Sequence, residues 1–392
     1  MRVSRTDRSL VAEWWFTVDR VLLTAFFILI GMGAVLSLAA GPAVAIKKGL
    51  PTFYFVERHL LVAVTGTILM LGVSLLSPRQ IRRLALLVLV CALGMMVAVL
   101  MSGPEINGAR RWLRIGGHSF QPSEIGKPTF IVLSAWLFAE SSKRTDVPAV
   151  PLAAALYVLF VSLIVLQPDI GQALLVSLVW GGLFFLSGQP LSRIVLFGLI
   201  ATSGFAGVYA TFPHVRGRIA RFFDPSSGDT YQTDRAIESF TEGGFFGRGP
   251  GEGMIKTNLP DAHTDFPFAV IGEEFGTIAC LFIVGLFAFV VFRALRHVWR
   301  DPDAFTRLAI TGLALLFGLQ ALINMGVNVG LVPAKGMTLP FISAGGSAYL
   351  AVSLLAGMLL SLTRRRADAG RVKKPSFRTT TAGMELGGLD LR

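Results

Sequence analysis

Residues 258–276 read NLPDAHTDFPFAVIGEEFG and join a charged, glycine-rich segment to a long hydrophobic run. Ionisable residues crowd this junction, among them His263, Asp265, Glu273 and Glu274. Ionisable side chains are costly at membrane depth, so a cluster there indicates a site that faces water or protein rather than lipid. The alternative is that Asp265 only caps the next helix, with Pro267 in its first turn. The residues alone leave both interpretations open.

The hydrophobic run is one of many in a chain of 392 residues, of which 53% are hydrophobic and 15% are charged. Apolar runs of about 20 residues match the thickness of a bilayer core. We therefore predict an all-α, polytopic integral membrane protein with about ten transmembrane helices, of which the fourth has the weakest signal. The predicted spans are 21–41, 59–77, 84–102, 125–141, 149–167, 170–187, 192–212, 267–292, 307–330 and 344–363.

These spans divide the chain into an N-terminal tail (1–20), a membrane domain (21–363) and a basic C-terminal tail (364–392). The membrane domain includes a large extracytoplasmic loop, 213–266, between spans seven and eight. Most of the 36 Lys and Arg residues fall in the two tails and in the loops on the same side as the tails. Positive charge collects on the cytoplasmic side, so both termini are predicted to be cytoplasmic. Topology thus explains the net charge of +12, and no nucleic-acid partner is expected.

The remaining basic residues cluster in the outer loops. A short outer loop and its edge carry Arg110, Arg111, Arg114 and Lys127, the long loop carries Arg216, Arg218, Arg221, Arg235, Arg248 and Lys256, and the last loop carries Lys335. Four cations in or beside a short outer loop run against the charge rule. An anionic ligand would explain them, because Arg side chains match phosphate oxygens. Lipid headgroups, or local pairs with Glu124 and Asp224, are the alternative.

Three loop motifs allow both a structural and a functional interpretation. The Gln-Pro turns at Gln121 and Gln167, each followed by an acidic residue, are typical of helix starts and favour simple caps. The run GGFFGRGPGEG at 243–253 either lets a ligand approach the backbone closely or serves as a flexible linker.

The last outer loop, at 332–350, reads VPAKGMTLPFISAGGSAYL and indicates a re-entrant turn. In the ninth predicted span, Gln320, Asn324 and Asn328 recur every fourth residue and form a polar stripe. Such a stripe favours contact between helices over the lining of a cavity.

Taken in order, these motifs resemble the SEDS family (shape, elongation, division and sporulation), whose members are ten-span bacterial membrane proteins regarded as peptidoglycan glycosyltransferases. The matching runs are NGARRWL at 107–113, QPSE at 121–124 with Lys127, QPDIGQA at 167–173, Tyr231-Gln232, GGFFGRGPGEG, LPDAHTDFPFAVIGEE at 259–274 and LPFISAGGS at 339–347. The Lys335-Gly336-Met337-Thr338-Leu339-Pro340 run resembles the cell-division branch more than the elongation branch. Ala344, Pro267 and Gln172 depart from the usual pattern, and none of them removes an acidic residue.

The resemblance implies that Asp265, in the HTDF motif, is the catalytic aspartate. It also implies lipid II as substrate, a disaccharide-pentapeptide on undecaprenyl pyrophosphate. Elongating a glycan needs a base for the sugar hydroxyl and groups that hold the departing pyrophosphate. The predicted substrate-binding residues are Arg110, Arg111, Lys127, Arg216, Arg248, Lys256, Gln232, Lys335 and Ser343. The predicted supporting residues are Glu124, Asp169, His263 and Glu274.

A divalent cation, Mg or Mn, is an optional cofactor that would help to hold the pyrophosphate, and its ligands are unknown. The expected partners are a class B penicillin-binding transpeptidase, other division proteins and membrane lipid. The expected location is the bacterial cytoplasmic (inner) membrane at the division septum. Two rival functions remain at this level: a flippase that transports lipid II, and a scaffold without catalysis that recruits the transpeptidase. The charged outer loops favour the enzyme, because a transporter should carry ionisable groups near the middle of its spans.

Overall fold

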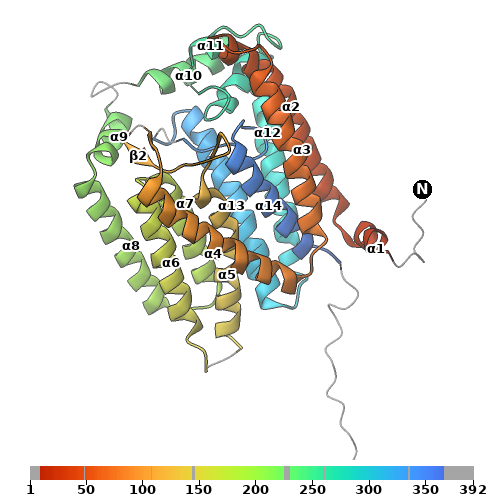
Figure 1. Ribbon diagram of the computed structural model, residues 1–392, viewed down its shortest axis with the longest axis vertical. Helices are drawn as coiled ribbons and strands as arrows, with labels where there is room; N and C mark the ends of the chain where they lie inside the picture. Colours follow the sequence, from red (N-terminus) through yellow and green to blue (C-terminus); the bar gives the residue numbers. More distant parts are fainter. Residues whose placement is uncertain are drawn as a thin grey trace, which may run out of the picture.

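The structure is a computed structural model that describes residues 9–47, 49–106, 108–143, 146–224, 230–259, 261–333 and 336–365. Long helices dominate it, and each of the ten predicted spans overlaps one of them (Figure 1). These helices are α2 (Arg20–Lys47), α3 (Tyr54–Ser74), α4 (Pro78–Ser102), α5 (Pro122–Ser141), α6 (Ala149–Leu166), α7 (Ile170–Leu186), α8 (Leu191–Thr211), α12 (Pro267–Val298), α13 (Ala304–Asn328) and α14 (Gly346–Leu362). The all-α, polytopic prediction is confirmed.

The helices differ in how well they could cross a membrane unaided. Seven are long and apolar enough to do so, namely α2, α3, α4, α6, α8, α12 and α13, while α7 and α14 are shorter apolar helices. Helix α5, the weak fourth run, belongs to neither group because it carries Glu124, Lys127 and Pro128. From Pro122 to Ala135 every residue of α5 except Ile125 is buried. Neighbouring helices therefore shield the polar side chains of α5 from lipid.

The helix starts follow the local sequence. Ser77 and Gln80 form a capping box at the start of α4, and the Asp303 side chain accepts the Thr306 amide at the start of α13. Proline opens α5 and α12, where its missing N–H costs nothing. At the opposite extreme from α5, helix α8 has no buried residue and lies along one edge of the molecule (Figure 1).

The segments outside the spans are more ordered than predicted. The long loop contains three helices, α9 (Pro213–Phe223), α10 (Tyr231–Gly243) and α11 (Ile255–Asn258), and the N-terminal tail contains α1 (Leu10–Thr17). The short outer loop folds into two antiparallel hairpins, β1 (Glu105–Ile106) with β2 (Ala109–Arg110), and β3 (Leu113–Ile115) with β4 (His118–Phe120). In Figure 1, α10 and α11 lie together at one end of the molecule.

Candidate functional site

The HTDF segment forms a tight turn between α11 and α12. Asp261 adopts a left-handed conformation with φ 53°, and its carbonyl accepts the amides of Thr264 (3.0 Å) and Asp265 (2.9 Å). The N-cap of α12 is Phe266, and the Asp265 side chain does not cap this helix. The interpretation of Asp265 as a mere helix cap is therefore wrong, and its carboxylate is available for another role.

The polar stripe of α13 fixes the backbone of this turn. The Asn324 side chain donates to the carbonyl oxygens of Asp265 (2.9 Å) and Met337 (2.5 Å). The Asn328 side chain also donates to the Asp265 carbonyl (3.2 Å), and its own oxygen accepts the Ala269 amide (2.9 Å) at the start of α12. Both asparagines are buried. The stripe thus contacts α12 through Ala269 and α5 through Lys127, as the favoured interpretation predicted, and it also binds loop backbone, which was not foreseen.

The carboxylate of Asp265 is only partly buried, and within the described ranges no hydrogen bond or ion pair engages it. A Cβ atom added to Gly336 would lie 2.9 Å from Asp265 Oδ2, so only a glycine lets the last outer loop approach the carboxylate this closely. Burial, and then repulsion from Asp261, raises the pKa of Asp265 to about 7. A carboxylate with such a pKa can act as a general base near neutral pH.

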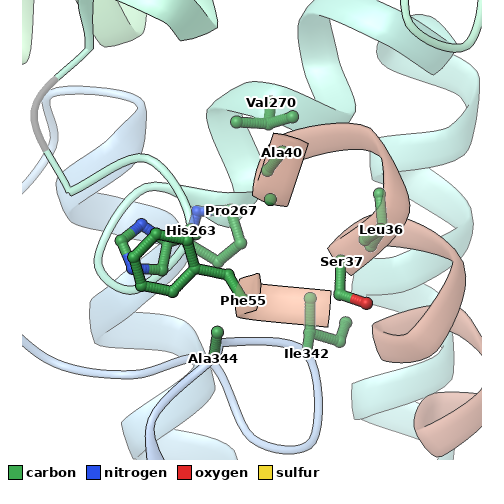
Figure 2. A pocket seen from close by; sticks show the side chains of 10 residues that line it. Leu36, Ser37, Ala40, Phe55, His263, Pro267, Val270, Ile342 and Ala344 are labelled. Atoms are coloured by element: carbon green, nitrogen blue, oxygen red, sulfur yellow. The ribbon is translucent and has the colours of Figure 1, made fainter. Parts of the chain in front are cut away.

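His263 connects this turn to α3 and to the last outer loop. Its carbonyl accepts the Ala344 amide at 2.9 Å, and its ring lies 4.8 Å from the ring of Phe55, centroid to centroid. Figure 2 shows both rings beside Pro267 and Ala344, at the wall of a small apolar hollow that also involves α2. His263 therefore positions the turn, which agrees with its predicted supporting role.

A buried polar network links α5, α7 and α13 to the last outer loop. Lys127 Nζ lies 2.9 Å from Glu124 Oε2 and donates to Gln172 Oε1 at 2.7 Å. The Gln172 amide donates to Glu124 Oε1 at 2.7 Å, which closes a ring of three side chains. Lys127 also donates to Gln320 (3.4 Å), whose amide donates to the Thr338 carbonyl (3.1 Å). Lys127 is only 2% exposed, so it holds the interior together rather than facing a loop.

The two Gln-Pro turns lie against each other. Gln121 donates to Asp169 Oδ2 at 3.1 Å, although neither residue caps its helix with its side chain. Arg111 donates to the carbonyls of Gln167 (3.0 Å) and Pro168, and its guanidinium lies 3.8 Å from Asp169. The interpretation as two separate caps is therefore wrong. Arg111 and Asp169 join the outer ends of α5 and α7.

The GGFFGRGPGEG loop packs directly onto a kink in α12. Gly276 has φ 79° and interrupts the helix, and the Arg248 amide donates to the Glu273 carbonyl at 2.9 Å. A Cβ atom on Gly247 would lie 2.1 Å from the Glu274 carbonyl oxygen. The glycines thus allow close approach to α12, which neither interpretation from the sequence foresaw. The loop supplies partners for backbone groups that the kink releases.

The acidic pair of α12 is engaged by α11. Glu273 accepts the amides of Ile255 (2.6 Å) and Lys256 (2.9 Å), and Glu274 forms a buried ion pair with the Lys256 side chain. A buried carboxylate needs such partners. The Lys256–Glu274 pair therefore anchors the long loop to the membrane domain.

The other predicted residues lie as follows. Ser343 accepts the Leu339 amide at 2.7 Å, which stabilises the re-entrant turn. Arg110 (3.5 Å from Glu105) and Arg248 (paired with Glu242) form exposed ion pairs, and Arg216 and Gln232 are exposed. Lys335 lies outside the described residues. Of all these residues, only Asp265 and His263 belong to the turn. Lys127 and Glu124 are linked through Gln320 to Thr338 in the last outer loop. The sequence did not point to Asn324 and Asn328 as part of the site, although their spacing was visible.

No metal site emerges from the part of the chain that is described, since no group of three or more His, Cys, Asp or Glu side chains there is placed to hold an ion.

The chain matches a known protein family and is similar in sequence to named proteins. A model of the FtsW, RodA and SpoVE family, described as "Cell cycle protein", matches residues 20–368. Over 367 residues the chain is 45% identical to a Caulobacter vibrioides protein named "Probable peptidoglycan glycosyltransferase FtsW", covering 93% of this chain and 94% of the relative. A protein of the same name from Tolumonas auensis is 32% identical over 380 residues, covering 93% and 98%.

Two solved structures resemble the whole membrane domain. One is a chain from the work "Structural coordination of polymerization and crosslinking by a peptidoglycan synthase complex", with TM-score 0.72 and 28% identity over 88% of this chain and 97% of that chain. The other is the rod shape determining protein RodA of Thermus thermophilus, with TM-score 0.65 and 25% identity over 91% and 99%.

Proposed function

Because the chain belongs to the FtsW, RodA and SpoVE family of cell cycle proteins, we propose that it is a peptidoglycan glycosyltransferase of the FtsW type. It polymerises lipid II into glycan strands on the outer face of the bacterial cytoplasmic membrane during septal wall synthesis. The Asp265 turn carries the proposal. Two buried asparagines hold its backbone, and its carboxylate has a raised pKa and no partner among the described residues.

Asp265 acts as the general base. The oxygen of the incoming sugar hydroxyl forms a bond to the anomeric carbon that carries pyrophosphate. The bond from that carbon to the pyrophosphate oxygen breaks, and its electron pair leaves with the pyrophosphate. The hydroxyl proton passes to the Asp265 carboxylate. A pKa of about 7 leaves roughly half of these carboxylates able to accept the proton at neutral pH.

The buried network has a positioning role. Lys127, Glu124 and Gln172 bond one another, and Gln320 links Lys127 to Thr338 in the last outer loop. The same loop brings Gly336 against Asp265. Arg216 is the predicted cation best placed to contact a phosphate, because it is exposed and no described residue engages its side chain.

The partner proposal is supported by one solved relative, which belongs to a complex that couples polymerization with crosslinking. A class B penicillin-binding transpeptidase is the corresponding crosslinking enzyme for this chain, and the remaining division proteins would bring the pair to the septum. Helix α8 has no buried residue in this chain, so its surface can contact lipid or such a partner.

The direct test is polymerisation by the purified protein. The full chain is incubated with lipid II, with and without a cognate class B transpeptidase whose crosslinking activity is blocked, and the products are separated by size. We expect glycan polymer with the transpeptidase present, and none when the transpeptidase is incubated alone. Lipid II that stays unpolymerised under all conditions, with both proteins folded, would contradict the enzyme proposal.

Both chain ends are proposed to lie in the cytoplasm. The Arg365 amide donates to the Thr17 carbonyl at 3.0 Å, and the Arg364 side chain donates to Thr17 Oγ1 at 2.9 Å, so the two ends share one side of the membrane domain. A reporter fused to the C-terminus should be active only in the cytoplasm, and one inserted after Gly228 only outside. Reporters on one side of the membrane would contradict this topology.

A further inference from the structure

A second pocket lies beside the Asp265 turn, between the outer ends of α3 and α14. Arg58, His59 and Tyr349 line this pocket, which we call the His59 pocket, and its empty volume including the open mouth is about 320 Å³. Phe55 and Ala344 belong both to this pocket and to the hollow that contains His263 (Figure 2). The His59 pocket therefore adjoins the hollow that contains His263, two residues from the candidate base.

Buried polar atoms converge at this place without partners. His59 Nε2, the Tyr349 hydroxyl and Ser353 Oγ are buried, and in the described ranges none of them has a hydrogen-bond partner. The exposed fractions of these residues are 4%, 3% and 0%. A Cβ atom on Gly66 would lie 2.5 Å from Ser353 Oγ and 2.9 Å from the Tyr349 ring, so a glycine makes room for this cluster. Buried polar atoms are normally paired, and the unpaired atoms of His59 and Tyr349, which both line the pocket, indicate a missing ligand.

The chemistry of the pocket favours an anion. His59 and Tyr349 can each donate a hydrogen bond, Arg58 adds a positive charge at the mouth, and no Asp or Glu lines the pocket. The pocket lies at the first turns of α3 and α14.

We propose that the His59 pocket binds the pyrophosphate of a polyprenyl-linked substrate. The inference rests on the proposed function, in which two lipid-linked molecules meet at Asp265: one loses its pyrophosphate, and the other keeps it. Two pyrophosphates require two anion sites. The His59 pocket supplies one of them on the α3 and α14 side of the Asp265 turn.

The test uses the unpaired hydroxyl of Tyr349. Tyr349→Phe removes one buried oxygen and keeps the ring. Because that oxygen has no partner when the pocket is empty, the ligand-free variant should lose no thermal stability. The matched control is Ser134→Ala, which removes another buried, unpartnered hydroxyl from the middle of α5. His59→Phe is a second variant of the pocket. All are made in a full-length chain with Cys91→Ser and Ala344→Cys, so that a polar maleimide reports occupancy at the mouth.

Undecaprenyl pyrophosphate is expected to protect the cysteine at position 344, and undecaprenol is not. Tyr349→Phe and His59→Phe should each raise the half-protecting concentration roughly tenfold, the loss expected for one hydrogen bond to a charged group, while Ser134→Ala leaves it unchanged. Equal protection by inorganic pyrophosphate would support the anion site and assign it to free pyrophosphate. Equal protection by undecaprenol, or parental protection of both pocket variants, would overturn the proposal. The protection assay measures binding and needs no turnover. A wild type that makes no glycan would therefore contradict the proposed function and leave the test of the His59 pocket unaffected.

Discussion

Asp265→Asn is expected to slow glycan polymerisation by about 10²–10⁴-fold, the usual effect of removing a positioned general base. The substitution keeps the size of the side chain and removes its basicity. It leaves the backbone carbonyl free to accept from Asn324 and Asn328, so the turn should keep its shape. Thermal unfolding of the variant should match the parent, because the carboxylate makes no hydrogen bond or ion pair with the described residues that Asn would break.

The matched control is Asp261→Asn in the same turn. Asp261 has φ 53°, a conformation that Asn adopts readily, and its carbonyl bonds do not involve the side chain. Its side chain is exposed, so this variant should polymerise lipid II at neutral pH at close to the parental rate. A folded Asp265→Asn protein with parental activity would exclude Asp265 as the base.

Lys127→Met is expected to destabilise the protein strongly. It removes the partner of Glu124 in a site where both side chains are at most 5% exposed. Removing one member of a buried ion pair, which leaves the other unpaired, typically lowers the free energy of unfolding by about 3–5 kcal/mol. Replacing both members is often nearly neutral. The thermal unfolding midpoint in one detergent or nanodisc should therefore fall sharply for Lys127→Met and recover in the double variant Glu124→Gln/Lys127→Met.

The comparison for Lys127 is Arg248→Met, which breaks an ion pair whose partners are 42% and 41% exposed. Exposed pairs contribute about 0–1 kcal/mol, so its midpoint should hardly move. Equal midpoints for Lys127→Met and Arg248→Met would mean that the Lys127 network does not hold the interior together.

The sequence predicted the spans well because hydropathy is a local property of the chain. All ten predicted spans overlap helices, and the one weak span, α5, is weak because protein rather than lipid surrounds Glu124 and Lys127. The position of Asp265 between a charged loop and an apolar helix was equally visible. The resemblance added its expected role, which no pattern of spacing could supply.

The partners of the charged residues were beyond the sequence. The predicted anion-binding residues Arg111 and Lys256 are bound to the Gln-Pro turn and to Glu274, contacts that depend on how distant helices meet. The packing of the glycine-rich loop on α12 was not foreseen for the same reason, since close approach to α12 and close approach to a ligand need the same residues. The orphan atoms of the His59 pocket likewise become visible only when α3 and α14 are placed side by side.

The pH dependence of polymerisation tests the role of Asp265 most directly. Burial and Asp261 raise the pKa of Asp265 to about 7, and a base works only when deprotonated. The kcat/KM of the wild type, measured between about pH 5 and pH 9, should rise roughly tenfold per unit below pH 7 and level off above it. Asp261→Asn removes a repulsion, so the rising limb should move to lower pH. A wild-type profile that stays level across this range would contradict the account.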